Sequence, residues 1–95
     1  MTKTQAEKLI LAFSRTAESL GVLVRTERLQ GVGGVPVSSG LAQVDDSWVI
    51  FLEKRQPPKE RLSALIEALS RFDLSLADPD PEAAAYLQKI RPMVD

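Results

Sequence analysis

The longest apolar run in this chain, Trp48–Leu52, is the feature that most constrains its fold. Five consecutive apolar residues fall far short of the roughly 20 that a membrane-spanning helix needs. A strand without alternation between apolar and polar residues is usually covered on both faces or central in its sheet. The run therefore predicts a buried or central strand over residues 48–54.

Two further segments predict strands. Residues 41–44 ("LAQV") precede the apolar run, and the polar residues Asp45–Ser47 between them predict a hairpin turn. Residues 22–29 ("VLVRTERL") are rich in β-branched side chains and roughly alternate, which predicts the first strand. Because short strands with local connections usually pair in chain order, we expect an antiparallel meander.

Apolar residues at spacings of three and four predict a helix ahead of these strands, over about 3–20. Thr2 or Thr4 can cap its first turn, because a hydroxyl accepts a hydrogen bond from a free backbone N–H two or three residues on. Gly21 follows the last apolar residue and suits the left-handed conformation that often ends a helix.

Two more helices are predicted behind the strands. The second lies within residues 56–72 and begins at Pro57 or Pro58, since proline is tolerated in a first helical turn. The third covers about 81–91, with Asp80 as its cap, and we expect it to pack more loosely than the others.

These elements predict one α+β domain over residues 1–95 in the order α-β-β-β-α-α. The first and second helices should cover one face of the small antiparallel meander sheet. The side chains expected to meet between the sheet and the helices are Leu9, Phe13, Val49, Phe51, Leu62, Ile66 and Leu69, while the parity of residues 48–52 that faces the helices stays open, because both parities are apolar.

Composition narrows the chemistry that the chain can perform. It has no cysteine and no histidine, which removes disulfides, thiolate chemistry, the commonest general base near neutral pH and the commonest zinc ligands. No basic-then-apolar leader opens the sequence. We therefore expect a cytoplasmic protein that is not an enzyme, with no catalytic residue, no metal and no cofactor.

A glycine-rich segment is the one candidate for a ligand site. Four of the five glycines lie within residues 28–40 ("RLQGVGGVPVSSG"). A Walker loop would continue with Lys and then Ser or Thr, and a dinucleotide fingerprint would open a helix directly. Val35 and Pro36 follow instead. The pattern therefore favours a mobile loop between strands over a phosphate site.

If the loop over 31–40 does bind a ligand or partner, its own small residues and the cations beside it are the candidates. These site residues are Arg28, Gly33, Gly34, Ser38 and Lys54.

Charge counts disfavour nucleic acid as the partner. The net charge is −1, and acidic residues intervene among the cations in and around the predicted strands. Binding by counterion release needs several uncompensated cations, and an RNA-binding sheet needs exposed aromatic residues for stacking. Trp48 and Phe51 are the aromatics in the predicted strands, and both are expected in the core.

The segment "SGLAQVDDSWVIFLEKRQPPKERLSALIEALSRFDL" resembles small uncharacterised bacterial proteins, usually called hypothetical proteins. It combines a small-residue strand, a turn, an apolar strand, a helix begun by proline and a closing "FDL". The resemblance covers about a third of the chain and implies no function.

A looser similarity is to zincin-like metallopeptidases, which place a strand hairpin before a helix that carries H-E-x-x-H. On that pattern "IEALS" offers Ile66, Glu67 and Ser70, of which Glu67 alone matches, because both histidine positions differ. A real relationship would make this chain a catalytically inactive scaffold.

Three hypotheses for function follow. The first is a non-catalytic binding or assembly module of a bacterial cytoplasmic protein, with a protein partner or a second copy as its target and no contact with membranes. The second is an inactive relative of the zincin-like fold. The third is a binder of a small ligand or nucleic acid that uses the loop over 31–40.

Overall fold

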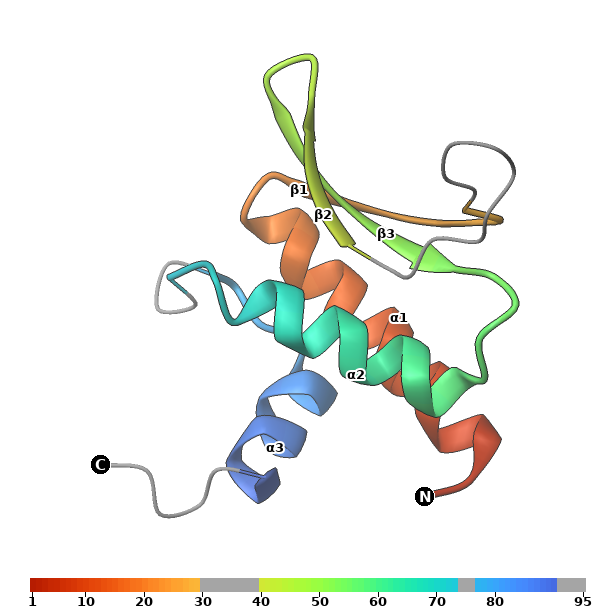
Figure 1. Cartoon of the computed structure of the whole chain (residues 1–95). Coiled ribbons are helices and arrows are strands. Elements are labelled where there is room, and N and C mark those ends of the chain that lie inside the picture. Colours follow the sequence, from red (N-terminus) through yellow and green to blue (C-terminus); the bar gives the residue numbers. More distant parts are fainter. Residues whose placement is uncertain (30–39, 74–76, 91–95) are drawn as a thin grey trace.

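The structure, a computed structural model, describes residues 1–29, 40–73 and 77–90 (Figure 1). The α+β class and the order α-β-β-β-α-α predicted from the sequence are confirmed. The elements are α1 (Lys3–Ser19), β1 (Val22–Glu27), β2 (Gly40–Val44), β3 (Ser47–Glu53), α2 (Pro58–Leu69) and α3 (Pro81–Ile90). Within the described ranges no helix is long and apolar enough to cross a membrane.

Local chemistry sets the ends of the first elements. The Thr2 hydroxyl accepts from the Gln5 N–H while the Gln5 side chain accepts from the Thr2 N–H, which forms a capping box at the start of α1. Gly21 then turns the chain into β1 with a φ of 79°, a conformation that glycine adopts without a steric penalty.

The hairpin between β2 and β3 uses a two-residue turn. Asp45 and Asp46 have φ angles of 50° and 68°. Positive φ at both central residues is the geometry that matches the twist of an antiparallel hairpin. The predicted turn is therefore confirmed at this place in the chain.

The strands are arranged in the order β1-β3-β2, so the predicted antiparallel meander is wrong. β2 and β3 are antiparallel, but β1 and β3 are parallel, with Val22 opposite Trp48 and Glu27 opposite Glu53. The prediction of a central strand is confirmed for β3. A strand as apolar as β3 is stabilised by a neighbour on each side, and a meander would have left it at an edge.

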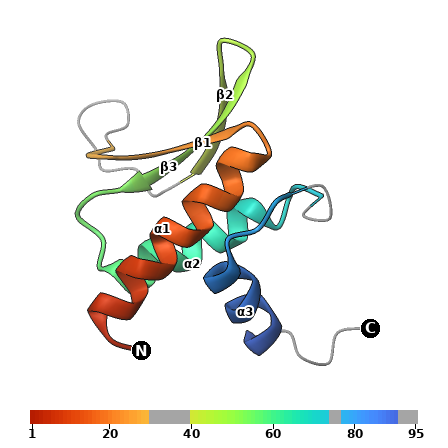
Figure 2. The ribbon, with the colours of Figure 1, turned by 180° about the vertical axis from the view of Figure 1, so that it is seen from behind.

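The three helices of the described residues lie on one side of the sheet, as both views of the ribbon show (Figures 1 and 2). Ile50 and Leu52 point from β3 into the core between the sheet and the helices. Val49 is also buried but does not belong to this cluster, and Phe51 is half-buried. The prediction that Val49 and Phe51 face the helices is therefore wrong by one residue of strand parity.

Trp48 also departs from its predicted place in the core. Its side chain is 42% exposed, and its ring meets the Phe72 ring edge to face at 6.0 Å. Trp48 lies at the start of β3, beside the hairpin turn, where the helices no longer cover the sheet fully.

The helices contribute the rest of the core. Of the residues predicted there, Phe13, Leu62 and Leu69 are buried, and Leu9 and Ile66 pack against the cluster while partly exposed. The fully buried Leu65 is the centre of the inward face of α2. α1 and α2 lie side by side and together cover the sheet, as predicted (Figure 2).

α3 is attached to α1 through both polar and apolar contacts. The Thr16 hydroxyl accepts from the Asp80 N–H at 3.1 Å, and Arg15 pairs with Asp80 at 3.2 Å. Asp80 also caps α3 by accepting from the Glu82 N–H. Ala83 is fully buried in the core.

Candidate functional site

The side of the sheet that faces away from the helices is the most distinctive surface of the described molecule. Because strand side chains alternate, residues 49, 51 and 53 of β3 lie opposite to the core-facing Ile50 and Leu52. The pairing register places their neighbours on the same side. We call this surface the helix-free face; its residues are Leu23, Arg25, Glu27, Gly40, Ala42, Val44, Ser47, Val49, Phe51 and Glu53.

Apolar side chains occupy one half of the helix-free face. Leu23 of β1 and Ala42 of β2 flank the buried Val49 of β3 in one row. Val44 extends the apolar area toward the hairpin turn. Leu23 is 49% exposed and Val44 is 43% exposed. A sheet face turned to water normally carries polar side chains, so these exposed aliphatic groups make this half of the face a candidate contact surface.

Charged side chains border the other half of the helix-free face. Arg25 and Glu27 are ion-paired at 2.7 Å on β1. Next to them, the Glu53 carboxylate accepts from Nε and Nη2 of Arg55 at 3.1 and 2.7 Å, from the Arg55 N–H, and from the Leu29 N–H at 2.9 Å. Arg55 also donates to the Leu29 carbonyl. This network ties the residues after β1 to the residues after β3.

The same network lowers the pKa of Glu53 to about 2, first through the hydrogen bonds from the Arg55 side chain and backbone. Glu53 is 6% exposed, so a carboxylate that stays ionised there requires these donors. Its role is to hold the ends of β1 and β3 together. A carboxylate so firmly ionised is a poor general acid or base near neutral pH.

The structure brings together two of the five residues predicted to bind a ligand or partner. The Lys54 N–H donates to the Glu27 carbonyl at 2.9 Å, so Lys54 and Arg28 lie at the same end of the sheet. Both are exposed. Gly33, Gly34 and Ser38 lie outside the described residues, as does the predicted mobile loop over 31–39, and these predictions stay open.

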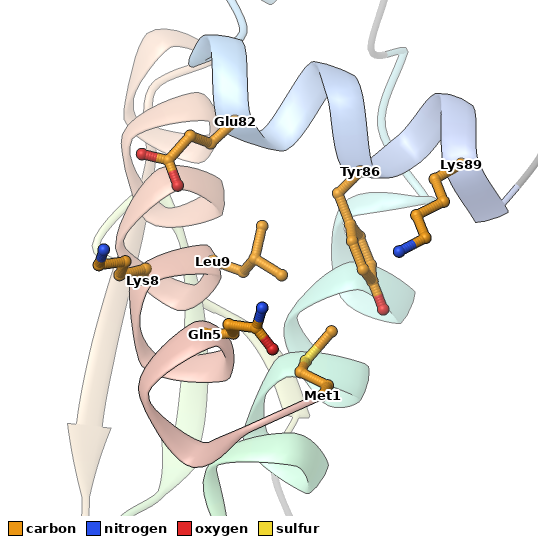
Figure 3. Close-up of a pocket in the computed structure, with 7 residues that line it drawn as sticks. All are labelled: Met1, Gln5, Lys8, Leu9, Glu82, Tyr86 and Lys89. Carbon is orange, nitrogen blue, oxygen red and sulfur yellow. The ribbon is translucent and has the colours of Figure 1, made fainter.

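A second candidate site is an open hollow of about 320 Å³ between α1 and α3 (Figure 3). Leu9, Tyr86 and Met1 supply apolar surface, and Lys8, Lys89 and Glu82 project their charged groups around it. The Gln5 side chain on its wall is engaged in the capping box of α1. Flexible, exposed side chains of mixed charge select no particular ligand, so this hollow supports no assignment.

The positions matched to the zincin pattern do not form a site in the described part of the chain. Glu67 is exposed on α2 and pairs with Arg71 at 3.8 Å, while Ile66 packs against the core. No group of three or more Asp or Glu residues that could hold a metal ion is found among the residues described.

Sequence reasoning missed the helix-free face, although a signal for it is present. Three consecutive apolar residues, Val22, Leu23 and Val24, begin β1. A strand covered on one face alone typically alternates apolar and polar residues, so this triplet indicates apolar side chains on both faces. The middle residue of the triplet is the one that the structure exposes.

Comparison of the chain with family models, curated proteins and solved structures gave no match. The resemblance to small bacterial proteins and the looser similarity to zincin-like peptidases therefore stay predictions.

Proposed function

We propose that the protein is a non-catalytic binding or assembly module that acts in the cytoplasm and contacts another protein through its helix-free face. The exposure of Leu23 and Val44 on a sheet face that no helix of the described ranges covers is the observation that carries this proposal. Burying such aliphatic groups against a partner is favourable by about 25 cal/mol per Å².

The chemistry of the chain supports a binding role over a catalytic one. It contains neither histidine nor cysteine. Its most strongly perturbed carboxylate in the described ranges, Glu53, is saturated with hydrogen bonds that fix the sheet. The lowered pKa of Glu53 is explained by these structural hydrogen bonds, so it does not indicate a group that exchanges protons with a substrate.

Charge substitutions on the helix-free face test this proposal. Val44→Asp and Leu23→Asp should each weaken capture of the partner from a lysate of the source organism by about tenfold or more, because a charge would be desolvated in the contact. Capture would be quantified with the tagged full chain by mass spectrometry.

Gln43→Asp is the matched control for Val44→Asp. Gln43 is also exposed on β2, but it lies on the helix side, opposite Trp48. It should leave capture unchanged. Equal loss with Gln43→Asp, or full capture by both face variants, would remove the helix-free face from the binding function.

A further inference from the structure

The outer edge of β1 carries backbone groups that no strand of the described residues binds. Glu27 accepts from the Lys54 N–H, so its backbone N–H and C=O are directed toward β3. Successive residues of a strand direct these groups to alternate sides, so those of Val24 and Thr26 are directed away from the sheet. β1 is an edge strand in the order β1-β3-β2.

This edge lacks two of the features that normally prevent pairing with another strand, a proline and a β-bulge, and its two charged residues, Arg25 and Glu27, have opposite signs. Its six residues, "VLVRTE", contain no proline, no glycine and no lysine. All six pair with β3 in unbroken register, so no bulge twists the edge away. Edge strands that stay unpaired usually carry such features. The backbone of β1 is therefore suited to accept one more strand.

The side chains of β1 favour a second copy of β1 in one register. A two-fold axis at Thr26 sets Arg25 directly opposite Glu27 of the second copy, and the symmetry gives this pair twice. An axis at Arg25 would set the two arginines opposite each other, and an axis at Val24 would set Arg25 opposite Leu23. Opposite charges across strands stabilise an antiparallel pair, and like charges destabilise it.

The same register is consistent with the rest of the edge. Thr26 has its backbone groups directed outward, so Thr26 and its copy form a hydrogen-bonded pair. In this register Leu23 lies opposite Leu29 of the second copy, a residue that follows the end of β1. The existing Arg25–Glu27 ion pair, at 2.7 Å, would extend into a network of four charges.

The helix side of the edge also offers apolar area to a second copy. A hollow at Thr26 is lined by Ile10 and Leu11 of α1 and by the charged residues Glu7 and Arg61. Leu11 is 59% exposed.

We propose that two copies of this chain associate through their β1 edges, antiparallel about Thr26, to form one six-stranded sheet. This self-association uses the edge of β1, whereas the proposed partner covers the helix-free face. Leu23 belongs to both surfaces and Val44 of β2 to the helix-free face alone, so the effect of Val44→Asp separates the two proposals.

Charge exchange at the edge tests the register. Light scattering coupled to size exclusion should give the wild type a mass of twice 10.4 kDa at micromolar concentration. Arg25→Glu and Glu27→Arg should each weaken the dimer by about tenfold or more, because like charges then meet across the strands. The double variant should restore the wild-type dissociation constant, since opposite charges would again face each other across the strands, with their positions exchanged. Circular dichroism would confirm that all variants fold.

A single introduced thiol tests the axis, since the chain has no cysteine of its own. Thr26→Cys should form a disulfide-linked dimer under mild oxidation, because a hydrogen-bonded pair places its Cα atoms about 5.5 Å apart. Arg28→Cys is the matched control. In this register its copy lies about 13 Å further along the strand, too far for a disulfide.

A wild type that stays monomeric up to millimolar concentration would overturn the proposal. A dimer that survives both single charge variants, or that links through Arg28→Cys as well as through Thr26→Cys, would also overturn it. A monomer that still captures a partner through Val44 and Leu23 would refute self-association alone, and a dimer that captures no partner would refute the proposed function alone.

Discussion

At the scale of single residues, Glu53 shows how one buried carboxylate fixes the end of the sheet. It lies opposite Glu27 in the parallel register of β1 and β3, where two acidic side chains would otherwise repel. Each has an arginine of its own, Arg55 for Glu53 and Arg25 for Glu27. The arginines thereby allow two strands that end in glutamate to pair side by side.

The lowered pKa of Glu53 predicts a pH dependence of stability. The folded value of about 2 lies below the ordinary 4.5, so the ionised carboxylate stabilises the fold fully above about pH 4.5. This contribution is lost as the pH falls from about 4.5 through about 2. In urea unfolding, Glu53→Gln should therefore be less stable than the wild type at pH 7, and the difference should shrink over that range.

Glu67→Gln is the matched control, because it removes one negative charge from an exposed site on α2. A difference in unfolding free energy between wild type and Glu53→Gln that stays constant from pH 7 to pH 2 would contradict the lowered pKa. Direct titration of the Glu53 carboxyl by NMR would give the same quantity independently.

Neighbouring residues on α2 provide a second prediction at this scale. Leu65 is fully buried in the core, whereas Ile66 is partly exposed against it. Leu65→Ala should cost about 2–5 kcal/mol of unfolding free energy, because it leaves a cavity that the helices cannot fill. Ile66→Ala removes a similar volume and should cost less. Chemical denaturation of both variants measures the difference, and an equal or reversed ranking would mean that the inward face of α2 is misplaced.

At the scale of elements, the junction between α1 and β1 depends on the backbone of Gly21. Its φ of 79° is strained for any residue with a Cβ, yet a Cβ placed there would touch nothing within 4 Å. Gly21→Ala should therefore destabilise the protein by about 1–2 kcal/mol through the backbone alone. Gly40→Ala is the control, since Gly40 is equally uncrowded without a left-handed φ. Its effect should stay within about 0.5 kcal/mol by thermal or urea unfolding; similar losses in both would exclude this explanation.

The sequence predicted the elements well because their signals are local. The apolar spacing of α1, the capping threonine and the two-aspartate turn act within a few residues. The order of the strands, in contrast, does not depend on local signals. Twelve residues separate Glu27 from Gly40, and a connection of that length allows β2 to pair with β3 and not with β1. The apolar run of β3 did indicate the correct order, because it predicts a central strand, and a meander in chain order would place β3 at an edge. The face that β3 turns to the helices could not be predicted, because both parities of the run are apolar.

At the scale of the whole molecule, the sheet is covered unequally. α1 and α2 cover its helix side, and α3 adds a further contact to α1 (Figure 2). Among the described residues, no helix packs on the helix-free face and no strand pairs with the outer edge of β1. The candidate site was harder to predict than the fold because it consists of ordinary aliphatic and charged residues. Whether such residues form a contact surface depends on their exposure to solvent, and that exposure is determined by packing between segments far apart in the sequence.

α3 determines whether the molecule unfolds as one unit. Ala83 is fully buried against the core, and the Tyr86 ring meets the Phe13 ring edge to face at 6.1 Å. These contacts predict that α3 unfolds together with α1. Ala83→Glu should therefore lower the unfolding free energy by about 2–4 kcal/mol, because a carboxylate would replace a buried methyl group without a partner.

Ala85→Glu is the matched control for this prediction, because Ala85 is exposed on the same helix. It should leave stability within about 0.5 kcal/mol of the wild type. Urea unfolding followed by far-ultraviolet circular dichroism and by Tyr86 fluorescence should give coincident transitions in the wild type, as a single cooperative unit requires. If Ala83→Glu released α3 at no cost to the remaining transition, α3 would be an appendage whose packing does not stabilise the sheet and its two covering helices.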